Sequence, residues 1–356
     1  MTRPFDSYRP PVEPRKKRKR KDPGRMGGGK DSMVGTFRFE SYYGKPVVKA
    51  PPWEAPIPIY LALGGLAGGS SLLAVGALAT GRKKLLRNTR IAAIGAGAIG
   101  SLALVADLGR PERFLNMFRV FKLSSPMSIG SWILGAFSAC AGLGVLGEVD
   151  DLLGRKIPLP KFVRKLIHKV AGPATVGAGV FGAPLAMYTS VLLGDTSVPT
   201  WNAAKERLPF VFVSSGAMAA SGMAMLTTPV EEAKPARILG ITGAACDLLA
   251  MQAMEKRMDP VAAEPLHEGD PGALLKWSEL AAITGAVATL VAGRWRLPAA
   301  AAGASMVAAS VLTRFGIFGA GIESVKNPRY TILPQKRRLA ERRACGEVGN
   351  SITTAG

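Results

Sequence analysis

The sequence is poor in the residues that hold metals and redox cofactors. Its 356 residues include three cysteines and two histidines. Cys140 and Cys246 lie in apolar runs and Cys345 lies near the C-terminus, without CxxC or CxxxC spacing, so neither an iron–sulfur cluster nor a structural zinc site is expected. A b-type haem needs paired axial histidines on spanning helices, whereas His168 and His267 fall in expected loops. The sequence therefore predicts no haem, no iron–sulfur cluster and no metal in this chain.

Charge is scarce in the middle of the chain, although the formal net charge is +21. The tails 1–55 and 319–356 hold 21 of the 46 Lys and Arg residues. No folded basic domain carries the charge, so anionic lipid and membrane topology explain it better than nucleic acid, which we do not expect as a partner. The polar N-terminus also lacks the apolar core of a secretory signal peptide, so the first apolar helix is expected to direct insertion.

What the chain does have is a series of long apolar runs. A spanning helix needs roughly 20 mostly apolar residues, and eight stretches qualify or nearly so. We predict an all-α polytopic membrane protein, with a basic, Pro/Gly-rich, largely disordered tail at 1–55, an eight-helix transmembrane domain at 56–320 and a basic C-terminal tail at 321–356. The expected spans are 57–79, 91–107, 128–147, 172–193, 209–227, 236–254, 273–293 and 297–318.

Small residues recur at four-residue spacing within these runs. Such spacing lets helices approach closely in hydrocarbon, so packing inside one bundle is the expected role. The stretch GAGAIG at 95–100 matches the dinucleotide fingerprint GxGxxG, but it lies inside an apolar run without the strand that this motif requires. We therefore interpret it as helix packing too. The other spaced pairs are Gly64/Gly68, Gly65/Gly69, Ala96/Gly100 and Ala299/Gly303.

Ionisable residues in the runs fall on one side of the membrane. With eight spans, both termini and the loops after the second, fourth and sixth spans face one side, here called side A, and the other loops face side B. Asp107, Asp247, Glu279 and Arg314 then all lie towards side A. Intramembrane charges are costly and usually paired or lining a cavity. We expect a polar cavity open to side A, with interfacial snorkelling an equal alternative for Asp107 and Arg314.

One connector between two apolar runs has a more distinctive sequence than a flexible loop requires. The stretch DLGRPERFLNMFRVFKLSSPMSIGSW at 107–132 resembles the signature of the NrfD/PsrC family, the quinone-interacting membrane subunits of polysulfide-reductase-like molybdoenzyme complexes. PPWEAPIPIYLALGGLAGGS at 51–70 resembles that family's first helix, and NPRYTILPQKRRLAERR at 327–343 resembles the tail of actinobacterial members. The likeness runs from about residue 40 to 343.

The resemblance implies eight helices in two four-helix bundles, in the bacterial cytoplasmic membrane. It implies binding of menaquinone or ubiquinone and electron exchange with a four-cluster ferredoxin-like iron–sulfur subunit, which connects to a molybdopterin catalytic subunit. The chain would not be catalytic alone.

The resemblance also suggests roles for individual residues. Asp107, Arg110 and Arg113 would form a charged cluster at the pocket mouth or lock the loop to its helix. A serine would cap the third span. Asp247 or Glu279 would supply protons. Some family members use a histidine near the first helix for the quinone carbonyl, and this chain has none there. The candidate quinone or pocket residues are Trp53, Glu54, Tyr60, Asp107, Arg110, Arg113, Ser125, Met127, Trp132, Asp247 and Glu279, and the candidate docking residues are Arg119 and Lys122.

Each of these residues could instead have a structural or lipid-contact role. Trp53 and Trp132 also suit the interfacial aromatic belt, and Arg119 and Lys122 also suit lipid phosphate. Two rival functions remain: an ion- or proton-translocating subunit or transporter using Asp247 and Glu279, and a purely structural anchor. The basic loops at 81–90 and 155–169 favour a cytoplasmic side B.

Overall fold

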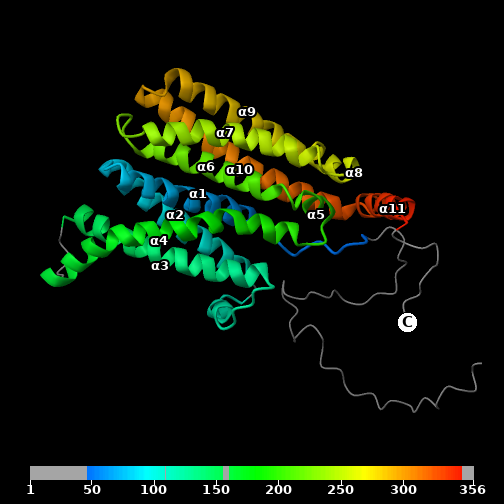
Figure 1. Cartoon of the computed structure of the whole chain (residues 1–356), viewed down its shortest axis with the longest axis horizontal. Coiled ribbons are helices and arrows are strands. Elements are labelled where there is room, and N and C mark those ends of the chain that lie inside the picture. Colours follow the sequence, from blue (N-terminus) through cyan, green and yellow to red (C-terminus); the bar gives the residue numbers. More distant parts are fainter. Residues whose placement is uncertain (1–45, 109, 155–159, 347–356) are drawn as a thin grey trace, which may run out of the picture. The chain divides into compact units, whose positions relative to one another are not determined.

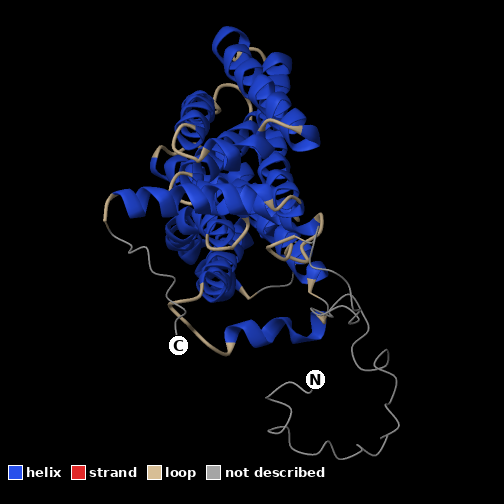
Figure 2. Cartoon of the chain, turned by 90° about the vertical axis from the view of Figure 1, so that its right-hand side faces the viewer, coloured by secondary structure: helices blue, strands red, loops and turns tan. Residues whose placement is uncertain are grey.

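A computed structural model of the protein describes residues 46–108, 110–154 and 160–346 (Figure 1). Within these ranges the regular secondary structure is helical, and no strand occurs (Figure 2). Most of the predicted N-terminal tail, 1–55, lies outside the described residues.

Eight helices are long and apolar enough to cross a membrane. Each overlaps one predicted span, so the expected all-α polytopic membrane fold is confirmed. They are α1 (Pro56–Ala79), α2 (Lys83–Asp107), α3 (Pro126–Leu152), α4 (Lys161–Gly194), α6 (Leu208–Thr227), α7 (Lys234–Glu255), α9 (Gly269–Ala292) and α10 (Arg296–Lys326).

The helices run past the predicted spans, and α4 differs most from its prediction. It starts at Lys161, so Pro173, predicted in the first turn, lies inside the helix, as does Pro184. His168, predicted in a loop, is helical as well. A hydropathy pattern marks the apolar part of a helix, whereas the basic segment before it continues the same helix beyond the hydrocarbon, where water solvates its charges.

The remaining helices all belong to side A. They fall in the loops after the second, fourth and sixth spans or follow the eighth span, whereas the side-B connections have no helix of their own among the described residues. Figure 1 shows α5, α8 and α11 gathered at one end of the bundle. These elements are η3 (Pro111–Phe118), α5 (Pro199–Ala204), α8 (Pro260–Ala263), η4 (Glu264–Leu266) and α11 (Arg329–Ala344).

Helix α1 packs on both neighbouring groups of helices through glycines. A Cβ on Gly68 would overlap the Gly182 carbonyl oxygen of α4. A Cβ on Gly69 would lie 2.8 Å from the Gly216 carbonyl oxygen of α6, and Gly65 lies against the same glycine. The Gly65/Gly69 pair and Gly68 therefore pack closely between helices, as predicted, whereas Gly64 does not.

Helix α1 is the most buried of the spans, and α7 and α9 are the least. It contacts α2 and α4 on one side and α6 and α10 on the other. Because α4 also packs directly on α6, the division into two separate four-helix bundles stays a prediction.

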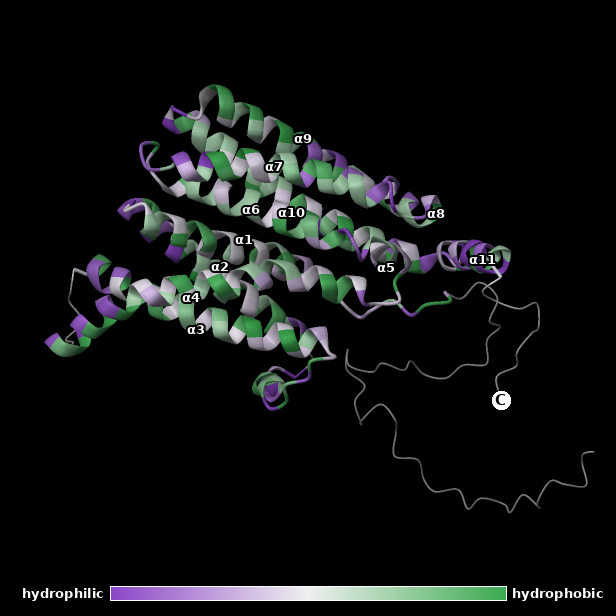
Figure 3. Cartoon of the chain, viewed as in Figure 1, coloured by the Kyte–Doolittle hydropathy of each residue, from purple (hydrophilic) through white to green (hydrophobic). Residues whose placement is uncertain are grey.

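Polar side chains tie helices together near side B. The buried Arg90 guanidinium of α2 donates to Thr175 Oγ1 and the Ala171 carbonyl of α4 and to Glu148 of α3, at 2.8, 3.1 and 2.8 Å. From the start of α10, Arg296 donates to three carbonyls at the end of α6. Figure 3 shows hydrophobic residues along the spans and hydrophilic residues gathered towards helix ends.

Candidate functional site

A buried acid and a buried arginine lie in the second half of the bundle. Asp247 of α7 is 4% exposed and Arg314 of α10 is fully buried. The two charges lie close enough to interact electrostatically, and Ser214 Oγ of α6 lies 3.5 Å from Asp247 Oδ1. A buried charge is stable in hydrocarbon only with such partners. Asp247 and Arg314 therefore lie inside the bundle rather than at the interface.

The Arg314 guanidinium is only partly satisfied. Its Nη2 donates to the Phe212 carbonyl at 2.6 Å, and its Cζ lies 3.7 Å from the centre of the Phe212 ring. Nε and Nη1 are buried without a hydrogen-bond partner among the described residues. Leaving such groups unpaired costs free energy, so this position has donors available for a water or another acceptor.

A polar cavity of about 270 Å³ leads from Asp247 towards side A. Glu279 of α9 and Glu255 of α7 line it, and His267 and Gly272, at the side-A end of α9, lie at its outer part. The structure thus brings Asp247 and Glu279 to one cavity, and its walls come from η4, α7, α9 and α10.

A tyrosine pair lies in the core of the first four helices. The Tyr60 hydroxyl of α1 and the Tyr188 hydroxyl of α4 form a hydrogen bond, in which either oxygen can be the donor. Tyr60 is 3% exposed and packs beside Gly100 of α2, while the Tyr188 ring lies against Gly130 of α3. Four helices therefore enclose these two hydroxyls.

The segment preceding α1 packs against the side-A helices. Trp53 stacks on Trp201 of α5 with ring centres 5.8 Å apart, and Trp201 in turn lies 5.4 Å from Phe318 of α10. Trp53 is thus partly buried against the side-A helices, and the interfacial-belt role stays an alternative. Glu54 beside it is exposed.

The start of α3 is capped as predicted. Ser125 accepts from the Ser128 backbone at 3.4 Å. Ser128 Oγ donates to the Val120 carbonyl and accepts from the Lys122 backbone, both at 3.1 Å. Trp132 Nε1 also reaches the Val120 carbonyl, at 3.5 Å. These contacts fix the chain between η3 and α3, so this part of the connector is ordered by its own side chains.

None of the described residues of the connector 107–132 lines the Asp247 cavity, so the two candidate regions are separate. Asp107 ends α2, and η3 packs on α2 and α3, whereas the cavity is enclosed by helices on the far side of α1 (Figure 1). Helix η3 packs through Phe114 and Phe118, whose rings contact each other edge to face. The predicted connector residues Arg110, Arg113, Arg119, Lys122, Met127 and Trp132 are exposed.

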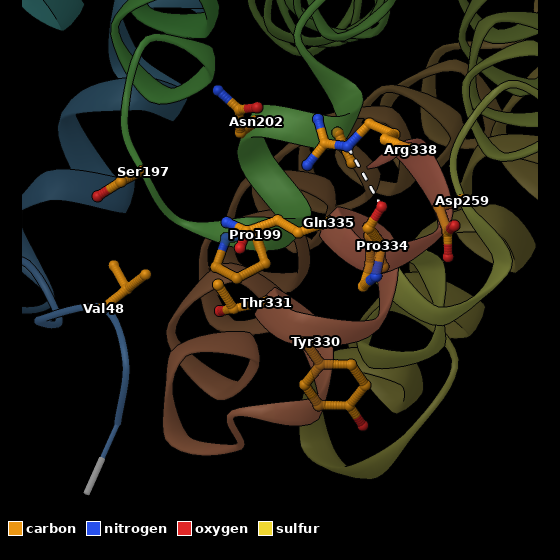
Figure 4. A pocket seen from close by; sticks show the side chains of 12 residues that line it. Val48, Ser197, Pro199, Asn202, Asp259, Tyr330, Thr331, Pro334, Gln335 and Arg338 are labelled. Carbon is orange, nitrogen blue, oxygen red and sulfur yellow. Dashed lines mark hydrogen bonds between the residues drawn. The ribbon is translucent and has the colours of Figure 1, made fainter. Parts of the chain in front are cut away.

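A second hollow, of about 340 Å³, lies at side A between α5, α8 and α11 (Figure 4). Asp259, Tyr330 and Arg338 line it. Burial and the neighbouring carboxylates of Glu268 and Glu264 raise the pKa of the Tyr330 phenol. The hollow lies apart from the tyrosine pair and from Asp247.

Three potential metal ligands, Asp150, Asp151 and His168, meet near side B within 4.8 Å of one another. Arg164 of α4 donates to both Asp150 oxygens, at 2.7 and 3.3 Å. This ion pair joins α3 to α4, and we assign the group a structural role. His168 and His267 lie at opposite ends of the bundle.

Sequence reasoning missed Tyr188, Trp201 and Ser214. A lone aromatic or hydroxyl residue in an apolar run gives no periodic signal, and only the fold shows that Tyr188 faces Tyr60.

Comparison with known proteins identifies the class. The sequence model of the family described as "Polysulphide reductase, NrfD" matches residues 46–245. Protein NrfD of Escherichia coli (strain K12) is 30% identical over 221 residues, covering 56% of this chain and 64% of that protein. The C polypeptide of polysulfide reductase from Wolinella succinogenes is 28% identical over 174 residues, covering 46% of this chain and 54% of that protein.

Eight spanning helices and this match define a multi-pass membrane protein. The chain belongs to the NrfD/polysulphide reductase family. The chain spans less than two-thirds of the length of each of these relatives. The family match ends at residue 245, just before Asp247.

Proposed function

We propose that this chain is the membrane subunit of a redox complex, and that it passes electrons between an iron–sulfur partner and menaquinone or ubiquinone in the membrane. Family membership and eight spanning helices support this assignment. A molybdopterin subunit would complete the complex, which would lie in the bacterial cytoplasmic membrane.

The quinone headgroup binds at the tyrosine pair in this proposal, and this pair is the observation that carries it. A quinone carbonyl accepts hydrogen bonds, and a buried tyrosine hydroxyl is a suitable donor. When the headgroup enters, one hydroxyl turns from its tyrosine partner to the carbonyl. The pair lies beside Gly130, within the helix that follows the family-like connector. Tyr60 thereby takes the place that a histidine takes in the expected family pattern.

Reduction of a quinone to a quinol takes up two electrons and two protons. The Asp247 cavity offers a polar route from side A into the bundle on the far side of α1 from the tyrosine pair, and Glu279 lines it as a candidate proton carrier. The electrons arrive from the partner subunit. Exposed Arg119 and Lys122 on the connector offer positive charge for docking an acidic surface of that partner.

Matched tyrosine variants test the headgroup site. In the assembled complex, Tyr60→Phe and Tyr188→Phe are expected to slow quinone-dependent oxidation of the partner's iron–sulfur cluster by about 5- to 30-fold, since each removes a hydroxyl worth about 1–2 kcal/mol to the bound headgroup. Tyr330→Phe, outside the membrane, is the control and keeps the parental rate. If both membrane variants assemble and react at the parental rate, the headgroup lies elsewhere or the chain is only an anchor.

Proton translocation is a second candidate function, favoured by the buried Asp247, which lines a polar cavity. Asp247→Asn is expected to lower the ratio of protons moved to electrons transferred in proteoliposomes of the complex. Asp195→Asn, an exposed acid after α4, serves as the control. An unchanged ratio in Asp247→Asn would exclude this residue from the proton route.

A further inference from the structure

A mostly apolar hollow with a volume of about 500 Å³ lies on the outside of the bundle, between α6 and α7. Small residues form its floor: Ala217 on α6 and Gly243, Ala250 and Ala253 on α7. We call it the α6/α7 groove. Because both helices are membrane spans, the groove faces hydrocarbon.

The groove follows the helices from the side-A end into the membrane. On α6 its lining runs from Arg207 to Ala217, and on α7 from Ala253 to Leu239. At 1.5 Å of rise per residue these stretches are about 15 and 21 Å long. One leaflet of the hydrocarbon core is about 15 Å thick. The groove therefore matches the depth of one leaflet, which is the depth that a phospholipid acyl chain occupies.

A positive charge marks the side-A end of the groove. Arg207 precedes α6, is half-buried, and makes no side-chain hydrogen bond or ion pair with the described residues. The first turn of α6 contains no acidic residue and has no side-chain cap. The helix dipole therefore adds to the positive potential there.

We propose that the α6/α7 groove binds an anionic phospholipid of the side-A leaflet, with its phosphate on Arg207 and one acyl chain along the apolar floor. The guanidinium fork suits a phosphate, and no protein anion competes for it among the described contacts. Lys205, exposed two residues earlier, adds a second positive charge. This site does not involve the tyrosine pair, although Ser214, which lies 3.5 Å from Asp247, also lines the groove.

Cys246 provides a native reporter because its exposed side chain lines the groove. In the full chain with Cys140→Ala and Cys345→Ser, Cys246 is the only thiol. In detergent, phosphatidylglycerol is expected to slow its reaction with N-ethylmaleimide several-fold more than phosphatidylcholine with the same acyl chains. Arg207→Gln should remove this difference, whereas Arg257→Gln, an exposed side-A arginine outside the groove, should keep it.

Further experiments distinguish the ligands that could occupy the α6/α7 groove. Inorganic phosphate alone is expected to give no protection. Native mass spectrometry of the same proteins should show retained phosphatidylglycerol with wild-type Arg207 and its loss in Arg207→Gln. As a second variant, Ala217→Trp fills the floor and should abolish protection while Arg207 remains. Equal protection by both phospholipids, protection that survives Arg207→Gln, or protection by a quinone instead would each overturn the proposal.

Discussion

At the scale of single residues, the absence of a side chain decides how α1 packs. Gly64 and Gly68 share one sequence pattern but not one environment. A Cβ at Gly68 would collide with the backbone of α4, whereas a Cβ at Gly64 would meet nothing within 4 Å. Backbone cannot move aside as a flexible side chain can, so the two positions respond differently to the same substitution.

Gly68→Ala is therefore expected to destabilise the protein by about 1–3 kcal/mol, because α1 and α4 must separate. Gly64→Ala, one turn away, is the control and should be neutral or slightly stabilising, since alanine favours helix. Thermal unfolding in detergent, followed by size-exclusion chromatography, measures both. Equal midpoints for the two variants would contradict the close contact.

The sequence predicted a functional role for a residue where its chemistry is unusual for its surroundings. A carboxylate in the apolar run around Asp247 pointed to a cavity from sequence alone, and the cavity is there. The Tyr60–Tyr188 contact was not predictable, because 128 positions separate the two residues and only the packing of α1 on α4 brings them together. Tertiary contacts of this kind leave no local pattern.

At the scale of the helix, α2 depends on a distant residue for its first turn. Its N-cap position, Arg82, has no side-chain cap. Instead the Glu232 carboxylate, between α6 and α7, accepts from the backbones of Lys84 and Leu85 at 2.8 and 3.2 Å. An anion at a helix N-terminus satisfies free N–H groups and complements the dipole.

Glu232→Gln removes that charge and is expected to cost about 1 kcal/mol of stability. Glu231→Gln changes the exposed neighbour and should leave stability unchanged. Hydrogen exchange at the first turn of α2 offers the sharper readout, with faster exchange in the Glu232 variant alone. The same rate in both variants would show that the cap contributes nothing.

The sequence predicted which segments form spanning helices, but it did not predict where those helices begin and end. Eight apolar runs report the length of hydrocarbon that each helix crosses. They say nothing about the basic turn at Lys161, which water stabilises, or about the side-A continuation of α10 to Lys326. Helix η3 was likewise hidden, since its aromatic contacts depend on α3.

At the scale of the whole molecule, eight spans place the end of α11 and the α1–α2 loop on opposite sides of the membrane. Cys345 is exposed at side A, and Lys83 is exposed at side B. A membrane-impermeant maleimide should label native Cys345 from one side only. In a Cys345→Ser background, Lys83→Cys should be labelled only from the other side. Labelling of both from one side would rule out an odd number of spans between them.

Helix length also limits the bilayer thickness that this fold can match. Helix α4 has 34 residues and is about 51 Å long, whereas α6 has 20 residues and is about 30 Å long. The hydrocarbon core itself is about 30 Å thick. A thicker bilayer would draw the basic start of α4 towards hydrocarbon, and beside α6 it must thin locally or leave polar ends in hydrocarbon. The shortest span, not the longest, therefore sets the greatest membrane thickness that the protein tolerates without deforming its surroundings.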